Sequence, residues 1–353
     1  MHRSPFSIAG PDDVTDARPS LAQRYRLRLK RRRLLWRSFR SRHDLVALAD
    51  RSGAIRAGDI LAVMVVRNEA QRLPYMLDHY RRLGVSHFLV VDNMSSDATV
   101  ELLRAAPDVS LWQTGASYRD ARFGLDWASW LLMHFGHDHW CLMADADELL
   151  VYAGCDHHDL RDLTARLEAR GQLAFGALML DLYAKGPVGE ADAAPGTDPV
   201  QAISWFDAGP YRAVRQVPGM NLWVQGGMRE RMFFADAPER SPTLNKLPLL
   251  RWNRRWAFTN SSHALLPWQV NMAWSGPGGP EPAGVLLHTK FLADVVDRAV
   301  EDLQRRQHFH DPDLLVPYYR AIAARPVLWT PDSRQLEGWE TLVQHGLMPA
   351  IDW

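Results

Sequence analysis

Apolar runs alternate with amphipathic segments between residues 60 and 144. The run 60–66 is apolar and rich in β-branched residues, which is typical of a buried parallel strand. In 73–83 apolar residues recur at helical spacing, and Gly84 follows, a residue type that commonly ends helices. The alternation continues with expected strands at 88–91, 109–113 and 140–144 and expected helices ending at 103 and spanning 119–135. This order predicts an α/β fold in which helices cover both faces of a parallel sheet.

The alternation is less regular after residue 150. We expect a helix at 160–170 and strands at 175–182 and 285–288. The segments 184–199 and 275–284 are rich in Gly, Pro and Ala and are expected to be loops. Tryptophan is frequent in this half, at Trp205, Trp223, Trp252, Trp256, Trp268 and Trp274. We expect most of these side chains to lie in the core.

The segment between Arg18 and His43 is basic and contains no acidic residue. Its cations are Arg24, Arg26, Arg28, Lys30, Arg31, Arg32, Arg33, Arg37, Arg40 and Arg42, and leucines and aromatic residues are interleaved with them. A helix of this composition has an apolar stripe edged by cations, which favours an anionic membrane surface as partner. The alternative is a solvated helix that lies over acidic surface of the same protein. We expect no nucleic-acid partner, because nothing else in the chain resembles a nucleic-acid module.

Composition narrows the class of protein further. The chain has 353 residues, of which 47% are hydrophobic and 23% charged, as in ordinary globular proteins. Lys plus Arg and Asp plus Glu both number 41, so no net charge favours a polyanion. Cys141 and Cys155 are too few for a disulfide framework and are interpreted as packing residues in a reducing compartment. With neither a membrane-spanning apolar run nor a signal-like N-terminus, the sequence predicts a cytoplasmic protein, peripheral on the inner face of the plasma membrane if the basic segment binds there.

Polar clusters follow three of the expected strands. They are Arg67-Asn68-Glu69, the segment 92–97, and Asp145-Ala146-Asp147-Glu148. Ligands of open parallel sheets bind at the carboxyl ends of the strands, so we expect these clusters to converge on a site. Carboxylates at Asp145 and Asp147 could hold Mg²⁺ or Mn²⁺ while leaving coordination positions for phosphate oxygens. The alternative is that these acids cap the next helix or form a solvated turn.

On these three clusters the chain resembles glycosyltransferase family 2 and related families with the GT-A fold, in the branch whose first strand ends in Arg-Asn-Glu. The resemblance covers residues 60–152 closely and the remainder loosely. It implies a GT-A type, Rossmann-like, mostly parallel sheet flanked by helices, with a Trp-rich acceptor side on which one or two tryptophans would stack on sugar. It also implies a metal-assisted, inverting transfer of a sugar from a nucleotide-diphosphate sugar to a hydroxyl of a glycan or lipid-linked glycan, with Mn²⁺ or Mg²⁺ as cofactor.

The resemblance assigns roles to individual positions. Asn68, Glu69 and Asp92 would contact the base and ribose, with Arg67 in the same loop and Arg122 near the nucleotide. Asp145 would contact the ribose and Asp147 would bind the metal and diphosphate. The alternatives are a capping role for Asp92 and a surface ion pair for Arg122.

Two motifs in the second half complete the predicted site. Gly226-Gly227-Met228-Arg229-Glu230-Arg231 places glycines beside Arg229 and Arg231, which suits close backbone approach and binding of phosphate, although a tight hairpin turn is the alternative. In Leu287-His288-Thr289-Lys290, the side chains of His288 and Lys290 would point to one face of a strand. His288 could then join Asp147 as a metal ligand and Lys290 could contact the diphosphate, whereas a lone strand histidine is often a core or surface residue.

The sequence departs from the family pattern at the catalytic base. The family usually has an acidic pair between the metal motif and the late histidine, and here Glu301-Asp302 comes after His288. The candidates are Glu230, Asp236, Glu239 and His263, of which we select Glu230 because it lies inside the glycine-rich turn. An ion pair with Arg229 or Arg231 is the alternative role for Glu230.

The sequence thus predicts a basic N-terminal arm at 1–52, a GT-A domain at 53–330 with a nucleotide half at 53–155 and an acceptor half at 156–292, and a tail at 331–353. Two other functions remain open. One is a non-catalytic, glycosyltransferase-like scaffold at a membrane surface. The other is an acid-loop phosphotransferase with an aspartate nucleophile, which is disfavoured because that class places its motif after the first strand. A sugar-nucleotide pyrophosphorylase would need a glycine-rich loop where Arg67-Asn68-Glu69 stands.

Overall fold

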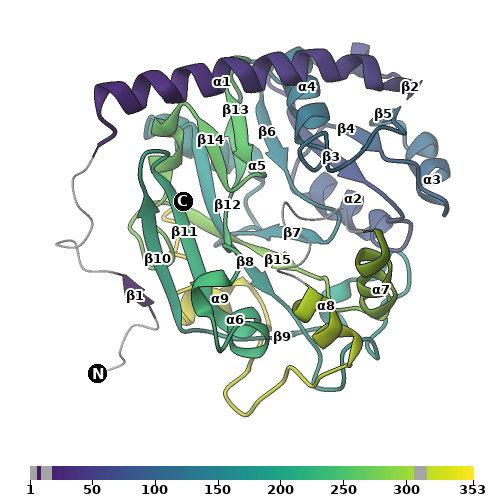
Figure 1. Cartoon of the computed structure of the whole chain (residues 1–353), viewed down its shortest axis with the longest axis vertical. Helices are drawn as coiled ribbons and strands as arrows, with labels where there is room; N and C mark the ends of the chain where they lie inside the picture. Colours follow the sequence, from purple (N-terminus) through teal and green to yellow (C-terminus); the bar gives the residue numbers. More distant parts are fainter. Residues whose placement is uncertain (1–5, 9–17, 306–315) are drawn as a thin grey trace.

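A nine-stranded sheet in the order β2-β5-β4-β3-β6-β12-β8-β15-β7 forms the centre of the molecule (Figure 1). The computed structural model describes residues 6–8, 18–305 and 316–353. The strands are β2 (Val46–Ala49), β3 (Ile60–Val66), β4 (His87–Asp92), β5 (Val109–Gln113), β6 (Trp140–Met143), β7 (Glu148–Val151), β8 (Ala174–Asp181), β12 (Asn245–Arg251) and β15 (Ala283–His288). Strands β2, β7 and β12 run against their neighbours, and the others share one direction. The predicted α/β class with a mostly parallel sheet is confirmed.

Helices cover both faces of the sheet because successive side chains of a strand point to opposite faces. On strand β3, Ile60 and Met64 pack with α2 (Leu73–Arg82), α3 (Thr99–Ala105) and α5 (Leu160–Ala169). Leu61 and Val63 of the same strand pack with α4 (Leu125–Phe135) on the other face. Each face therefore has its own apolar core.

The element predictions hold for most of this half, with one informative exception. A helix was expected from residue 119, but α4 begins at Leu125. Arg122, Phe123 and Gly124 have positive φ angles of 54°, 58° and 76°, so the chain makes an irregular turn before the helix. Two of these residues are not glycine, and the sequence pattern therefore gave no sign of the turn.

Residues 21–49 pack on this body. Helix α1 (Leu21–Ser41) lies along the top of the molecule in Figure 1 and begins with a capping box made by Ser20 and Gln23. Its buried Leu34 packs on the hairpin of β13 (Ala257–Asn260) and β14 (Ala264–Leu266). Strand β2, within the predicted arm, pairs with β5 at the edge of the central sheet. In the described part of the chain, no helix is long and apolar enough to cross a membrane.

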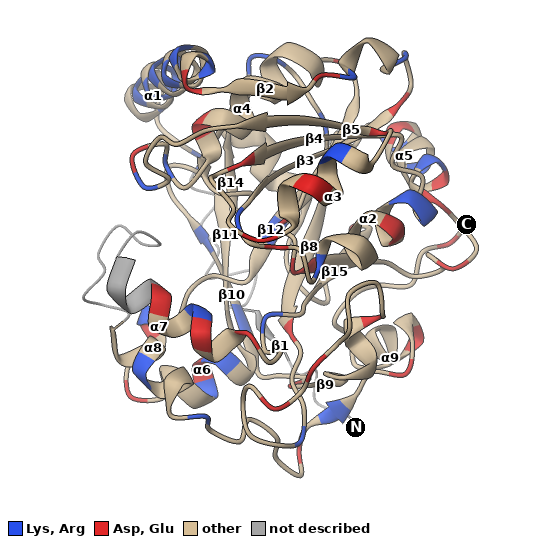
Figure 2. Ribbon diagram, turned by 90° about the vertical axis from the view of Figure 1, so that its right-hand side faces the viewer, with Lys and Arg blue, Asp and Glu red and all other residues tan. Residues whose placement is uncertain are grey.

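The remaining elements flank the carboxyl edge of the sheet. They are β1 (Phe6–Ile8), β9 (Trp205–Phe206), β10 (Tyr211–Gln216), β11 (Asn221–Gly226), α6 (Gly227–Phe233), α7 (Val295–Arg305), α8 (Val316–Ala323), β16 (Arg334–Gln335) and α9 (Trp339–Gln344). Helices α6, α7 and α8 share a small apolar cluster that includes Met228, Val295 and Tyr318 (Figure 2). At the C-terminus, Trp353 stacks on His158 and donates a hydrogen bond from Nε1 to the carbonyl oxygen of Ala153.

Candidate functional site

The register of strand β15 brings several acids to one point. Its last residue, His288, is paired with Asp181 at the end of β8 on one side and with Glu148 at the start of β7 on the other. Asp147 lies in the turn between β6 and β7, and its carbonyl oxygen accepts a hydrogen bond from the backbone N–H of Thr289. The polar side chains predicted at separate strand ends therefore meet at the carboxyl edge of the sheet.

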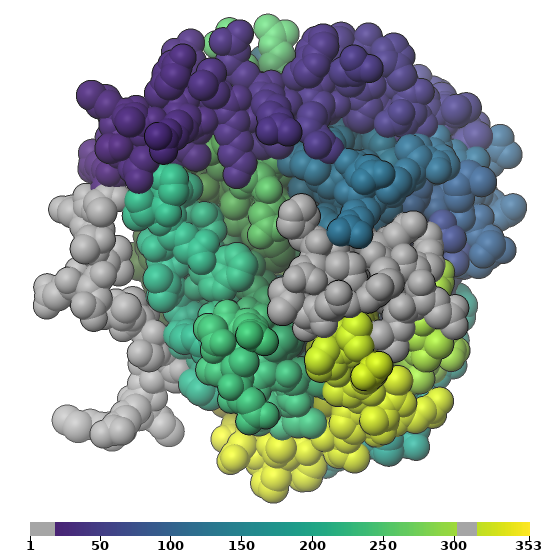
Figure 3. Space-filling view, in the orientation of Figure 1, coloured from purple at the N-terminus to yellow at the C-terminus, as the bar shows by residue number. Residues whose placement is uncertain are grey.

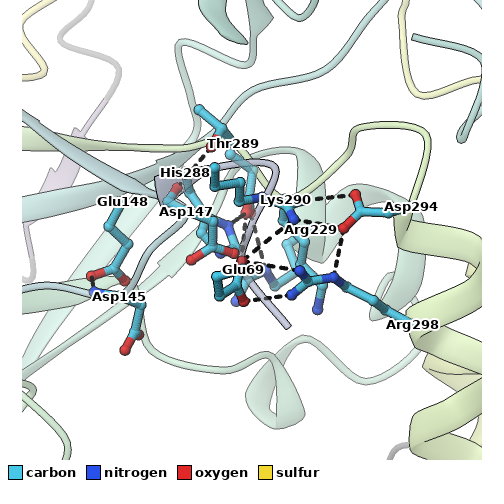
Figure 4. Close-up of polar contacts among 12 residues, drawn as sticks. Glu69, Asp145, Asp147, Glu148, Arg229, His288, Thr289, Lys290, Asp294 and Arg298 are labelled. Carbon is cyan, nitrogen blue, oxygen red and sulfur yellow. Dashed lines mark hydrogen bonds and ion pairs between the residues drawn. The ribbon is translucent and has the colours of Figure 1, made fainter. Parts of the chain in front are cut away.

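His288 lies between two carboxylates (Figure 4). Its Nδ1 is 2.6 Å from Oδ1 of Asp181, and its Nε2 is 3.2 Å from Oδ2 of Asp147. Burial alone would lower the pKa of His288, but the two carboxylates outweigh it and raise the pKa to about 9. The same contact with His288 overcomes the burial of Asp147 and holds the pKa of that carboxyl well below its usual range. The pair is thus ionised at neutral pH.

Arg229, from the first turns of α6, completes this group. Its Nε and Nη2 donate to the carboxylate of Asp181 at 3.0 and 2.5 Å, and Nη2 is 3.3 Å from Nδ1 of His288. Position 226, just before α6, requires a glycine. Gly226 has a φ of 131°, and a Cβ there would lie 2.1 Å from the carbonyl oxygen of Pro210. The close backbone approach expected at these glycines is therefore made to strand β10.

A second charged group lies on the other side of Asp147. Lys246 of β12 is buried, and its Nζ is 2.8 Å from Oε1 of Glu148 and 3.5 Å from Oδ2 of Asp145. Burial opposes the charge on Lys246, but Glu148 and Asp145 outweigh it and raise the pKa of the ammonium group above its ordinary value. The Asp145 side chain is 60% exposed. Asp145 therefore still has oxygen atoms available to a ligand.

Residues of both groups line a cavity of about 790 Å³ on the α4 side of the sheet, namely Arg229 and His288 of the first group and Asp145, Glu148 and Lys246 of the second. Asp147 and Asp181 are not among its lining residues. The cavity is a suitable size for a nucleotide-sized ligand. Its lining contains more cations than carboxylates: Arg37, Arg119, Arg122, Arg229, Lys246 and Lys290 against Asp120, Asp145 and Glu148. Lys290 differs from the buried cations, because its Nζ lies 3.4 Å from the Tyr318 hydroxyl with no carboxylate within 4.0 Å in the described part of the chain. The cavity therefore suits an anionic ligand.

The first predicted nucleotide loop is joined to its neighbours by hydrogen bonds. Arg67 donates from Nη1 to the carbonyl oxygen of Asn93 at 2.8 Å, and Asn68, with a φ of 54°, accepts from the backbone N–H of Ser96. Glu69 receives Nη1 of Arg298 from helix α7 at 2.6 Å, as Figure 4 shows. None of the three is among the residues that line the cavity.

Asp92 and Arg122 have partners within the protein. Asp92 is fully buried and accepts hydrogen bonds from Nε2 of Gln113 at 2.8 Å and from the backbone of Ser95 at 3.2 Å. The Ser95 contact is of the capping kind expected as the alternative for this residue. Arg122 does line the cavity, while its Nε donates to Asp126 at 2.8 Å.

Glu230 and Arg231 are not among the residues that line the cavity. The Glu230 carboxylate accepts from Nη1 of Arg212 at 2.6 Å, so its ion pair is with a residue outside the glycine-rich turn. Arg231 donates from Nε to Asp207 at 2.8 Å. Of the two arginines expected to meet phosphate, Arg229 is the one that lines the cavity.

His263 lines the cavity and has a defined tautomer. Its Nδ1 contacts the carbonyl oxygen of Asn245 and must donate the proton, which leaves the lone pair on Nε2. Burial and the nearby Lys246 lower its pKa to about 3, so the ring is neutral at pH 7. It is the member of the four predicted base candidates that borders the cavity.

Asp147 and His288 were predicted to bind a metal, and their geometry is compatible with this role. In the described part of the chain no group of three or more His, Cys, Asp or Glu side chains is arranged to hold a metal ion. Mg²⁺ and Mn²⁺, however, are often bound by one or two protein ligands together with substrate phosphates and water. Asp181 holds Nδ1 of His288 and directs Nε2 toward Asp147, as carboxylates do for metal-binding histidines. The pair could hold a metal that binds together with a phosphate ligand, provided that the metal displaces the proton from Nε2 of His288.

Three contributors were missed from the sequence. Asp181 ends an otherwise apolar run, and a carboxylate in that position could have indicated it. Lys246 lies in β12, for which no strand was expected, and Arg298 lies on α7, far along the chain from Glu69. Neither of the last two has a local sequence pattern that would have revealed its partner.

Comparison with known proteins gives no family assignment. No protein-family model matches the chain, and no curated protein matches it. Among solved structures, it is similar to the mannosyltransferase PcManGT from Pyrobaculum calidifontis in complex with GDP-Man and Mn²⁺, with 18% identity, 45% of this chain and 47% of that chain covered, and a TM-score of 0.28. The chain thus spans about half the length of that mannosyltransferase.

Two further solved structures are similar to a comparable degree. One is a 4-diphosphocytidyl-2C-methyl-D-erythritol synthase, with 19% identity, 41% of this chain and 68% of that chain covered, and a TM-score of 0.25. The other is a putative glucose-1-phosphate thymidylyltransferase from Bacillus anthracis in complex with a sucrose, with 9% identity, 76% and 84% covered, and a TM-score of 0.27. Similarity at these TM-scores carries no inference about function, which must come from the geometry of the chain itself.

Proposed function

We propose that the chain is a glycosyltransferase that moves a sugar from a nucleotide-diphosphate sugar to a hydroxyl group of a glycan or lipid-linked glycan. The observation that supports this most is the cavity of about 790 Å³ at the carboxyl edge of the sheet, lined by six cationic side chains and by His288, whose Nε2 contacts Asp147 behind the lining. A nucleotide diphosphate combines the size and the charge that such a cavity accommodates.

The diphosphate would lie toward Arg229, His288 and Lys290. Lys290 lacks a carboxylate partner in the described residues, so it can bind phosphate without breaking an ion pair. Asp147 and His288 would hold Mn²⁺ or Mg²⁺, an ion that neutralises the charge of a diphosphate leaving group. Asp181 would keep the His288 ring in place by the hydrogen bond that it accepts from Nδ1, and Arg229 would in turn hold Asp181 by donating to its carboxylate.

The loops after β3 and β4 would lie beside the nucleoside. Asp145 has an exposed carboxylate at the cavity and suits a ribose hydroxyl. Arg122 lines the same cavity. Arg67, Asn68, Glu69 and Asp92 would support this end by the network that joins the two loops, and Glu69 would have to exchange Arg298 for a ligand if it bound the base itself.

For the proton of the acceptor hydroxyl, His263 replaces Glu230 as our choice of base. Nε2 of His263 carries a lone pair, whereas both oxygens of Glu230 are engaged by Arg212. The low pKa of His263 makes it a weak base in the empty cavity. A bound diphosphate adds negative charge beside it and would move this pKa toward the operating pH.

A thermal-shift experiment tests the nucleotide and metal parts together. We expect the melting temperature to rise with at least one of UDP, GDP, CDP or dTDP in the presence of Mn²⁺, because a ligand that binds only the native state stabilises it. Asp147→Asn should abolish this shift while the protein remains folded. Asp332→Ala, at an exposed position, is the control and should keep the full shift. If the wild type responds to none of these nucleotides, the proposal is wrong.

A further inference from the structure

Helix α1 has a second apolar face that points away from the protein. The face that packs on the body uses Leu34, Ser38 and Ser41, which are buried. On the opposite side lie five large side chains, Leu21, Tyr25, Leu29, Trp36 and Phe39, of which Phe39 at the edge of the row also packs against Trp130 of α4. With 100° between successive residues, these five fall on one side of the helix, in a row that Arg32 interrupts. We refer to these five side chains as the outer stripe.

The outer stripe is unusually exposed for residues of its type. Leu21 is 81% exposed, Tyr25 62% and Trp36 59%. The helix has 21 residues and so extends for about 30 Å, and the stripe follows its length. Figure 3 shows the helix as a purple band along the top edge of the molecule. A row of large apolar side chains on a surface marks an interaction site more often than chance exposure does.

Positive charge surrounds the outer stripe without a matching negative charge. Figure 2 shows the concentration of Lys and Arg on this helix. Among its basic residues, Arg37 has a carboxylate partner, Asp126, at 2.9 Å, and for the others none lies within 4.0 Å in the described part of the chain. Burial, together with the nearby Arg28 and Arg255, lowers the pKa of Arg31, as expected where cations crowd one another. Apart from Arg37, the basic residues of the helix are therefore not paired with acidic residues in the part of the chain that the structure describes.

A groove beside the outer stripe is likewise lined by cations and apolar side chains. It measures about 180 Å³ and lies between α1 and the short helix Trp268–Ala273. Arg24, Arg28 and Arg31 line it, with Trp268 on its other wall and no acidic residue in the lining. Three guanidinium groups around a groove of this size suit a phosphate group.

From these observations we propose that the outer stripe of α1 docks flat on a bilayer that contains anionic phospholipid. The apolar side chains would enter the boundary between headgroups and acyl chains, and the flanking arginines would meet the phosphates. Nucleic acid would use the cations but would leave the five apolar side chains without a partner. The chemistry of this face therefore fits a lipid surface better than another polyanion.

Docking through the outer stripe would also place the central cavity close to the membrane. Arg37 belongs to α1 and lines the central cavity, where its Nη2 donates to the carbonyl oxygen of Asp120. The rim of the cavity would thus lie next to the lipid surface. If the proposed function holds, this arrangement favours an acceptor that is anchored in the membrane.

Sedimentation with lipid vesicles tests the docking surface. The full chain should bind vesicles of phosphatidylcholine and phosphatidylglycerol at least tenfold more tightly than vesicles of phosphatidylcholine alone, and salt should weaken the binding. The double variant Leu29→Glu with Trp36→Glu should bind the anionic vesicles at least tenfold more weakly than the wild type. Since both side chains point to solvent, its melting temperature should not change.

The matched control is Leu173→Glu with Val327→Glu, which adds the same charge at two exposed apolar positions outside α1. It should bind vesicles within twofold of the wild type. A second variant, Arg32→Gln with Arg33→Gln, should weaken binding and reduce its dependence on salt.

The docking proposal is wrong if the wild type binds neutral and anionic vesicles equally, or if the control variant loses as much vesicle binding as the Leu29→Glu with Trp36→Glu variant. It is also wrong if a DNA duplex displaces the wild type from vesicles and the Leu29→Glu with Trp36→Glu variant binds that duplex as tightly as the wild type does, because the helix would then be a nucleic-acid site. The nucleotide-dependent melting shift should be the same in this variant as in the wild type. A failure of docking is therefore distinguishable from a failure of the transferase proposal.

Discussion

At the scale of single residues, the site depends on charges that compensate one another out of water. Asp181 binds both Arg229 and His288, and all three side chains are buried. Each of these charges would be costly without its partners. The strand-end acids Asp145 and Asp147 could be predicted because a carboxylate that follows an apolar strand is conspicuous. Their partners could not, because Arg229 and Lys246 become neighbours only through the register of the sheet.

Removal of the Asp181 carboxylate should therefore destabilise the folded protein. We expect Asp181→Ala to lower the free energy of unfolding by about 3 to 5 kcal/mol, since it leaves Arg229 buried without a counterion. Asp332→Ala, an exposed change of the same kind, should alter it by less than about 0.5 kcal/mol. Urea denaturation followed by circular dichroism provides the comparison. Equal stability of the two variants would contradict the assignment of Asp181 as the central acceptor.

A histidine outside the site should determine part of the acid sensitivity. His79 of α2 contacts the carbonyl oxygen of Leu150 through Nε2 at 3.0 Å. Burial lowers its pKa to about 4, with Arg82 adding to the effect, although the hydrogen bond to Leu150 and the charge of Asp198 oppose it. The unfolded state, with a pKa near 6.5, takes up the proton first as pH falls. The stabilisation is therefore complete above about pH 6.5 and is lost as pH falls toward 4.

The variant His79→Gln isolates this contribution. Gln can donate the same hydrogen bond but does not titrate, so its free energy of unfolding should fall less steeply than that of the wild type between pH 6.5 and pH 4.5. The difference in slope should approach about 1 kcal/mol per pH unit at most. Parallel pH profiles would show that His79 is not a buried neutral group.

At the scale of elements, the regular β and α segments around residues 60–113 could be predicted, and the irregular ones could not. Strand β5 was expected at its observed bounds, because apolar residues in a buried strand form a continuous run. Strand β12 was missed because it contains Lys246 and Pro248, which are unusual in a buried strand. The turn at Arg122 and Phe123 was missed because residues other than glycine adopt positive φ there.

The start of α6 offers a test of backbone approach. Gly226 has a positive φ, and an added Cβ would clash with Pro210, the residue that precedes strand β10. We expect Gly226→Ala to lower the free energy of unfolding by at least about 2 kcal/mol or to reduce soluble yield. Gly53→Ala is the control, since a Cβ there meets nothing within 4 Å. A stable Gly226→Ala protein would show that the approach is less close than the structure indicates.

At the scale of the whole molecule, segments from both ends of the chain meet the α/β body around the cavity. Helix α1 supplies Arg37 to its lining, and helix α7 reaches the first loop through Arg298 and Glu69. The sequence predicted a basic helix and a late motif at His288, but it left open whether the helix would lie over the body or face a membrane surface. Both faces of α1 carry large apolar side chains, so the sequence pattern alone did not show which face packs on the body.

In the proposed function, the cavity binds a nucleotide-diphosphate sugar, and Asp147 and His288 hold a divalent metal beside it. A panel of nucleotide sugars incubated with the protein and Mn²⁺ tests both points, with released nucleotide diphosphate as the readout. We predict slow hydrolysis of at least one donor, reduced at least 100-fold in Asp147→Asn and unchanged in Asp332→Ala. If no donor is hydrolysed, or if Asp147→Asn hydrolyses a donor as fast as the wild type, the proposed function is wrong.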